Sequence, residues 1–86
     1  MRVVAVESST LAAVGYNARR KLLQLEFCSR GVYHYFGVPD PVHQALLSAP
    51  SKGRFFNQSI RGRFPYRRVS DRLGAQDVVA VRRGQE

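Results

Sequence analysis

The sequence predicts an α+β fold in which a three-stranded antiparallel β-meander is followed by two helices packed on one face of the sheet. Two patterns lead to this prediction. Residues 22–27 alternate between apolar and other side chains, as a half-buried strand does. Residues 42–49 carry apolar side chains at helical spacing and lie between two prolines. With 86 residues the chain has room for one domain, which we expect over residues 1–72. Residues 73–86 then form a flexible tail or an added edge strand.

Three β-favouring segments form the predicted sheet. The first covers residues 10–16, with residues 3–6 feeding into it, and a polar turn leads to the second at residues 22–27. Residues 29–31 interrupt the chain, and the third segment, residues 32–36, is rich in aromatic side chains. Because the turns between the segments are short, we expect neighbouring strands to pair antiparallel.

The loop between the second and third predicted strands decides which side chains share a face, because a slip of one residue moves every side chain to the opposite face. A three-residue loop that ends with Gly31 at positive φ pairs Phe27 with Tyr33. Tyr33 and Tyr35 then pack toward the core, with their hydroxyls at its rim. A two-residue loop would instead expose both tyrosines as a stacking surface for bases. We favour the buried arrangement because Leu25 and Phe27 need apolar neighbours.

Proline and capping residues delimit the two predicted helices. Asp40 is a good N-cap for the first helix, and Pro41 suits its first turn. Pro50 ends that helix, and Ser51 caps a second helix that runs to about residue 61. At helical spacing the second helix has an apolar side with Phe55, Phe56, Ser59 and Ile60, and a polar side with Arg54, Asn57, Gln58 and Arg61. We expect the following residues in or near the core: Phe27, Tyr33, Tyr35, Leu46, Phe56 and Ile60.

Positive charge is concentrated in one part of the chain. The formal net charge is +8, and residues 51–72 alone hold seven basic residues and one acidic residue. Such clustering points to an anionic partner rather than to a solvated basic surface without function, and the planar guanidinium of arginine suits phosphate. We therefore predict a small nucleic-acid-binding module, with RNA more favoured than DNA. Its arginine-rich helix and the basic loop after it supply the predicted contacts: Lys52, Arg54, Asn57, Arg61, Arg63, Tyr66, Arg67 and Arg68, with Tyr66 or Phe64 stacking on a base.

The same charge fits a second function class, a protein-interaction accessory domain that docks its basic helix on the acidic surface of a larger partner. Catalysis is not expected. His34 and Glu26 would face each other across the hairpin, but an outward ion pair is far more common there than an acid–base pair. Cys28 has no base near it except His34 and is expected to be an ordinary thiol.

The sequence also argues against metal binding and against a membrane span. The two histidines and one cysteine lack the spacing of metal ligands, so we expect no metal and no cofactor. Apolar runs fall short of the ~20 residues of a membrane span, so we expect a cytoplasmic protein without a membrane partner. The sequence leaves the oligomeric state open.

Short motifs follow one another in a defined order between residues 6 and 66: Ser8-Ser9, Val14-Gly15-Tyr16, Leu25-Glu26-Phe27, Gly31, Tyr33-His34-Tyr35, Gly37-Val38-Pro39, Ala49, Ser51, Gly53, Phe55-Phe56-Asn57 and Ile60-Arg61. Together they resemble the KTSC domain, which occurs at the C-terminus of some lysyl-tRNA synthetases and as a free-standing small bacterial protein, the form expected here. Tyr33 and Tyr35 match the Tyr-x-Tyr centre of that domain. The resemblance implies a small α+β domain for which RNA binding has been suggested, and it implies no catalytic residues.

Overall fold

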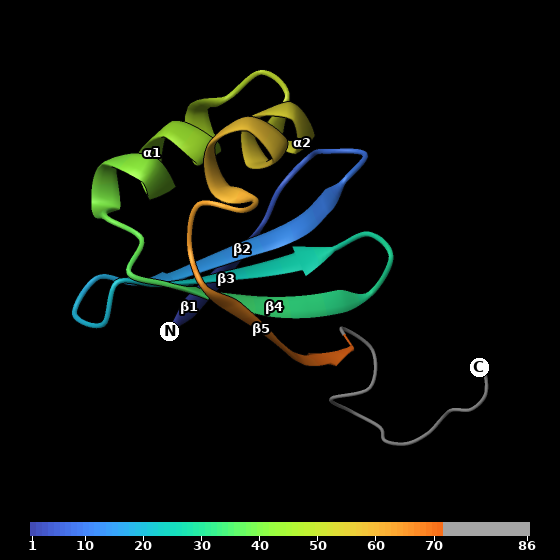
Figure 1. Ribbon diagram of the computed structural model, residues 1–86. Helices are drawn as coiled ribbons and strands as arrows, with labels where there is room; N and C mark the ends of the chain where they lie inside the picture. The colour runs from blue at the N-terminus through green and yellow to red at the C-terminus, as the bar shows by residue number, and fades with distance from the viewer. Residues whose placement is uncertain (72–86) are drawn as a thin grey trace.

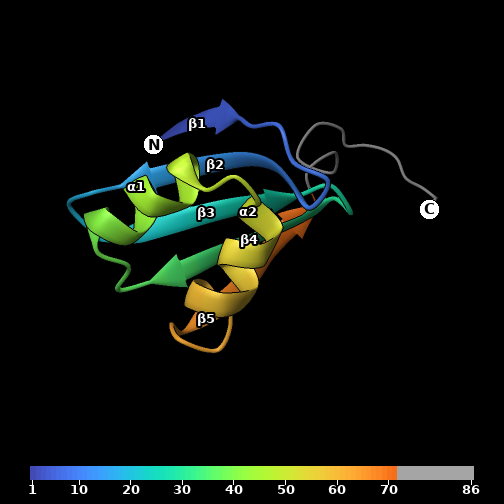
Figure 2. The same cartoon turned by 90° about the horizontal axis from the view of Figure 1, so that it is seen from above.

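The computed structural model describes residues 1–71, which form a five-stranded antiparallel sheet with its helices on one face (Figure 1). The strands lie side by side in chain order: β1 (Arg2–Ala5), β2 (Leu11–Asn17), β3 (Leu22–Phe27), β4 (Gly31–Phe36) and β5 (Tyr66–Asp71). Between β4 and β5 the chain forms α1 (Asp40–Ser48), α2 (Lys52–Phe55) and the π-helical segment η1 (Phe56–Ile60). Figure 2 shows these helices lying across the same face of the sheet.

The predicted sheet with helices on one face is confirmed, but the prediction of three strands is wrong. Residues that we expected to feed into β2 form the separate edge strand β1, in which Arg2 lies opposite Tyr16. Residues 66–71, which we expected in a basic loop, form β5 on the other edge and pair with β4. An edge strand can keep charged side chains in water, so β5 lacks the apolar alternation that reveals a strand in sequence. Residues 73–86, predicted as a flexible tail or an added edge strand, lie outside the described residues.

The hairpin of β3 and β4 has the predicted faces but not the predicted register. Leu25 lies opposite Tyr33, and Leu23 lies opposite Tyr35, so the pairing is displaced by two residues from the expected one. Because side-chain direction repeats every two residues, this displacement leaves each side chain on its predicted face. Tyr35 is therefore buried and Tyr33 half-buried on the side of the sheet that the helices cover.

The loop of this hairpin also differs from the prediction in its backbone. The left-handed residue is Arg30, with φ 83°, and not Gly31. Gly31 is needed for space, since a Cβ there would lie 2.9 Å from Cε1 of Tyr33. The missing side chain at residue 31 thus leaves room for the Tyr33 ring on the helix side of the sheet.

The helix boundaries follow the prolines and caps closely. The N-cap of α1 is Pro39, and Asp40 is the first helical residue, so the predicted cap is wrong by one position. The carboxylate of Asp40 instead accepts a hydrogen bond from Gln44 Nε2 at 3.3 Å, one turn along the helix. The predicted cap of the second helix is confirmed, because the Ser51 hydroxyl accepts a hydrogen bond from the Arg54 amide at 3.3 Å.

The second helix widens into a π-helical turn over its last five residues, 56–60. The amide of Arg61 donates to the carbonyl of Phe56, five residues earlier, at 2.8 Å. Phe56 and Ile60 both face the sheet and are 7% and 0% exposed. The predicted polar side stays in solvent, as the exposed residues show: Arg54, Asn57, Gln58 and Arg61.

The core lies between the sheet and the helices. Its buried members are Leu11, Val14, Leu23, Leu25, Tyr35, Val38, Leu46, Phe56 and Ile60. The predicted core residues are confirmed, with Phe27 and Tyr33 half-buried against this cluster. No helix within residues 1–71 has the length and apolar character that crossing a membrane requires.

Candidate nucleic-acid interface

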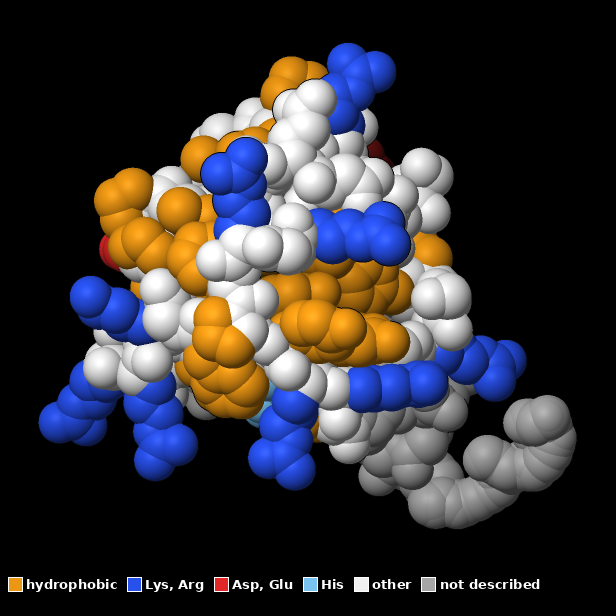
Figure 3. Space-filling view, viewed as in Figure 1, with side chains coloured by type: hydrophobic (Ala, Val, Ile, Leu, Met, Phe, Trp, Pro, Cys, Tyr) orange, Lys and Arg blue, Asp and Glu red, His pale blue; other side chains and the backbone are white. Residues whose placement is uncertain are grey.

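A groove of about 300 Å³ opens where β3, β4 and β5 approach the end of η1. Its walls hold five aromatic side chains together with Ser29, Arg61 and Gly62; the aromatic ones are Phe27, Tyr33, Tyr35, Phe56 and Tyr66. We call this feature the aromatic groove. Figure 3 shows hydrophobic side chains exposed in the middle of one face of the molecule, with Lys and Arg side chains around them.

The aromatic rings of the groove support one another in fixed orientations. Tyr66 stacks on Tyr35 with the ring centroids 5.4 Å apart and 27° between the planes. Tyr35 meets Phe56 edge to face at 5.7 Å, and Phe56 meets Phe27 in the same way at 5.2 Å. Because Tyr66 lies opposite Tyr35 across β4 and β5, strand register places the two rings on the same face. Tyr66 is 60% exposed, so it forms the outer ring of a cluster whose inner rings are fixed by packing.

The hydroxyl of Tyr35 stands out among the polar groups of the groove. The residue is only 4% exposed, and its hydroxyl makes no hydrogen bond to any other residue of the described part, 1–71. Burial, with smaller contributions from Tyr66 and Tyr33, raises the pKa of Tyr35 to about 12, although the charge of Arg61 acts in the opposite direction. The phenol is therefore neutral near pH 7 and offers both a donor and an acceptor.

Two of the predicted arginines lie at the aromatic groove. Arg61 follows the π-helical turn and forms part of the wall. The guanidinium carbon of Arg68 lies 6.0 Å from the centroid of the Tyr33 ring, a cation–π distance. Arg54 and Arg63 are exposed on α2 and in the turn after η1. The helix side of the molecule thus combines guanidinium groups with aromatic rings.

Other predicted site residues lie elsewhere or have structural contacts. Arg67 lies opposite His34 in the register of β4 and β5. Because neighbouring residues of a strand point to opposite faces, Arg67 is on the outer face of the sheet, away from the helices and from Arg68. Lys52 is half-buried, and its ammonium donates to the carbonyl of Ala49 at 3.1 Å, which satisfies the end of α1. Asn57 is exposed on η1 and does not line the groove.

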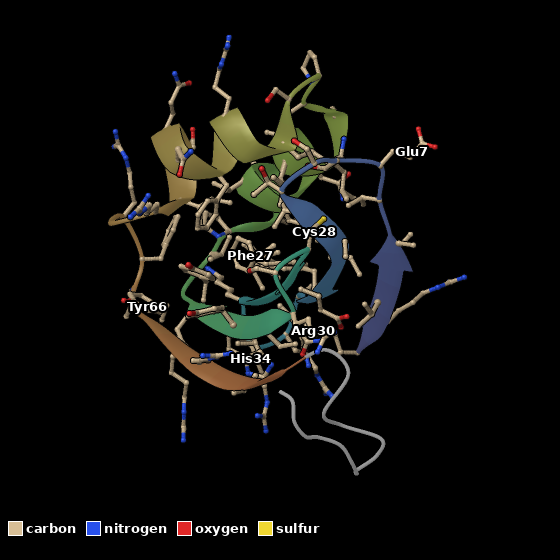
Figure 4. The ribbon with its side chains drawn as sticks, turned by 90° about the vertical axis from the view of Figure 1, so that its right-hand side faces the viewer. Glu7, Phe27, Cys28, Arg30, His34 and Tyr66 are labelled. Atoms are coloured by element: carbon tan, nitrogen blue, oxygen red, sulfur yellow. The ribbon has the colours of Figure 1, made fainter. Side chains whose placement is uncertain are left out.

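A chain of polar side chains occupies the outer face around His34. Figure 4 shows His34 on the opposite side of the sheet from Phe27. The displaced register places Gln24, and not Glu26, opposite His34, so the expected facing pair is wrong. Gln24 Nε2 donates to Glu26 Oε2 at 2.9 Å, and its Oε1 lies 2.7 Å from His34 Nε2. An amide therefore separates the imidazole from the carboxylate, which does not suit an acid–base pair.

His34 should make the stability of the protein depend on pH. Burial lowers the pKa of His34 below its ordinary value, and the charge of Arg67 lowers it further. As the pH falls through about 6.5, the unfolded chain takes up a proton that the folded protein resists, so the free energy of unfolding decreases. We expect a lower urea midpoint at about pH 5.5 than at about pH 7.5, and a smaller difference for His34→Gln. Arg67→Gln should fall between the two, and an unchanged pH dependence in His34→Gln would contradict the assignment.

Cys28, a candidate nucleophile in the sequence, has ordinary surroundings. Cys28 is exposed at the end of the hairpin, where its thiol lies 3.5 Å from the carbonyl oxygen of Ser8. Within residues 1–71 no three His, Cys, Asp or Glu side chains come together in a way that could hold a metal ion.

Sequence reasoning found part of the groove and missed the rest. It identified Arg61, Tyr66 and Arg68 as binding residues and Tyr33 with Tyr35 as a motif, and the fold brings these five together. It assigned Phe27 and Phe56 to the core alone, although both also line the groove. The spacing of Tyr33 and Tyr35 was the available signal, since residues two apart in a strand share a face.

Comparison with known proteins places this fold in a described family. The KTSC domain model matches residues 7–64. A protein of Stutzerimonas stutzeri is 48% identical over 61 residues, which cover 71% of this chain and 86% of that protein. A lysine–tRNA ligase of Nostoc punctiforme is 41% identical over 64 residues, 74% of this chain but 11% of the ligase. The crystal structure of a KTSC domain protein from Yersinia pestis matches with a TM-score of 0.78 and 39% identity, covering 80% of this chain and 97% of that one.

Proposed function

The chain belongs to the KTSC domain family, and from this membership together with the aromatic groove we propose that it binds nucleic acid, RNA in preference to DNA. The observation that carries the proposal is the position of Arg61 on the wall of a groove lined by aromatic rings. Proteins that bind single strands combine basic groups for the phosphates with aromatic rings for the bases. The preference for RNA is supported by relatives named lysine–tRNA ligase, in which the matched region is 11% of the enzyme.

Four arginines supply the phosphate contacts in this proposal: Arg54, Arg61, Arg63 and Arg68. Three of them are exposed: Arg54 on α2, Arg61 at the end of η1 and Arg63 in the turn that follows. Arg68 lies over Tyr33 on the same face of the sheet as these segments. The proposal therefore no longer includes Arg67, which faces away, or Lys52, whose ammonium is bound to a carbonyl.

The experiment that tests the function measures binding of labelled single-stranded RNA, single-stranded DNA and duplex DNA of equal length by fluorescence anisotropy. We expect RNA to bind, and we expect the double variant Arg61→Gln, Arg63→Gln to bind more weakly. Arg19→Gln with Arg20→Gln removes the same charge from exposed positions in the turn between β2 and β3 and serves as the control.

Absence of detectable binding to every nucleic acid at about 50 mM salt would refute the proposal. In that case the acidic protein surface would become the better hypothesis for the partner. We propose a binding role and not a catalytic one, in keeping with the amide that separates His34 from Glu26.

A further inference from the structure

The size and lining of the aromatic groove favour one class of ligand. At about 300 Å³ it stands at the lower end of the range for small-molecule sites, so it suits one planar group rather than an extended surface. In a duplex the faces of the bases are stacked on one another, and only base edges are open in the grooves. The aromatic rings of the groove can therefore stack on the face of a base only when that base is unpaired.

Tyr66 has the geometry of a stacking platform. Its ring rests on the buried ring of Tyr35, with centroids 5.4 Å apart, and lies 5.9 Å from the ring of Tyr33. With 60% of its surface exposed, it nevertheless has room to meet a ligand. Support from buried rings reduces the freedom that Tyr66 must lose on binding, which favours affinity.

Tyr35 adds a polar group at the same place. The Tyr35 side chain lines the groove, and its hydroxyl makes no hydrogen bond to another residue among residues 1–71. Because Tyr35 lines the groove, its hydroxyl is placed to donate or accept a hydrogen bond with a ligand that enters there. The edges of all bases carry donors and acceptors that can form this hydrogen bond.

Arg61 completes the set of groups that a nucleotide requires. It lines the same groove as Tyr35 and Tyr66, and its exposed guanidinium can contact the phosphate next to a bound base. A ring, a hydroxyl and a guanidinium, the groups that can recognise the face, the edge and the phosphate of one nucleotide, thus line a single groove. These three groups come from β5, β4 and the end of η1, which only the folded chain brings together.

We propose that the aromatic groove binds one unpaired base of a single strand, which stacks on Tyr66 and forms a hydrogen bond with the Tyr35 hydroxyl. This inference rests on the proposed nucleic-acid function and restricts it to single-stranded substrates. Tyr66 supplies affinity for any base, because every base has a π face. Tyr35 supplies preference among bases, because their edges differ.

The test compares labelled ten-nucleotide RNA homopolymers with a duplex of the same length, using the full chain. We expect Tyr66→Leu to weaken single-strand binding by about 5- to 150-fold, the range that a lost base–aromatic stack implies, and to leave duplex binding unchanged. Phe36→Leu is the matched control. Phe36 is 38% exposed on β4 and lies opposite Leu22 on the outer face, so its loss should change neither affinity.

A second variant tests the hydroxyl separately from the packing of the ring. Tyr35→Phe keeps the ring that stacks on Tyr66, so the fold should stay intact, which a melting curve checks. We expect it to reduce the differences in affinity among the homopolymers. Unchanged base preference would overturn the role of Tyr35.

The results for the groove and for nucleic-acid binding in general can be told apart. Equal affinity for single strand and duplex, with no effect of Tyr66→Leu, would overturn the base-binding groove while leaving a nucleic-acid function. If the parent protein binds no nucleic acid at about 50 mM salt, both the base-binding groove and the nucleic-acid function are overturned.

Discussion

Replacing Phe56 with alanine should lower the free energy of unfolding by about 3–5 kcal/mol, the usual cost of removing a buried phenylalanine ring. Phe56 is 7% exposed, and its ring meets both Phe27 and Tyr35 edge to face. Its removal would leave a cavity between η1 and the sheet. Domains of this size have a total stability of about 4–13 kcal/mol, so the loss removes a large fraction of it and should clearly lower the urea midpoint.

The measurement is urea unfolding monitored by circular dichroism, and Phe36→Ala is the control. Phe36 is an aromatic residue of β4 on the outer face and is 38% exposed, so its replacement should cost clearly less than that of Phe56, which is 7% exposed. A Phe56→Ala protein with the urea midpoint of its parent would show that η1 does not dock on the sheet as described.

Affinity for single-stranded RNA should fall about 50-fold when the salt concentration is raised from about 50 to 200 mM. Each phosphate neutralised on a single strand releases counterions and contributes about −0.7 to the slope of log affinity against log salt. Four contacts, from Arg54, Arg61, Arg63 and Arg68, give a slope of about −3. The measurement is a titration by anisotropy at several salt concentrations.

Variants show whether the slope belongs to the proposed surface. Arg61→Gln with Arg63→Gln removes two contacts, so the slope should flatten by about 1.4 and the same salt change should weaken binding only about 7-fold. Both residues are exposed, so glutamine should leave the fold intact.

Two controls separate local contacts from general attraction to a basic protein. Arg67→Gln removes one charge from the outer face of the sheet, and Arg19→Gln with Arg20→Gln removes two from a distant turn. Neither should flatten the slope appreciably. If the turn variant flattens it as much as the Arg61 and Arg63 pair does, binding is diffuse and the proposed surface is wrong.

Features that depend on neighbouring residues in the chain could be predicted from the sequence. Alternation in residues 22–27 located β3, and Pro41 in the first turn and Pro50 beyond the last one located the ends of α1. Ser51 marked the start of the second helix because a hydroxyl cap is a local interaction. The face of Tyr35 was also predictable, since a displacement of two residues in register does not change it.

Features that depend on pairing between distant residues were decided by the tertiary structure. β5 forms because β4 offers an unpaired edge to residues 66–71, and nothing in their own pattern separates an exposed basic strand from a basic loop. The register of that pairing places Tyr66 against Tyr35 and sends Arg67 to the opposite face from Arg68. Composition alone therefore predicted a basic, aromatic segment. The pairing of β4 with β5, two strands some thirty residues apart in the chain, decides which of these side chains share a groove. An edge strand has little hydrophobic pattern, so the sequence specifies the register of this pairing only weakly.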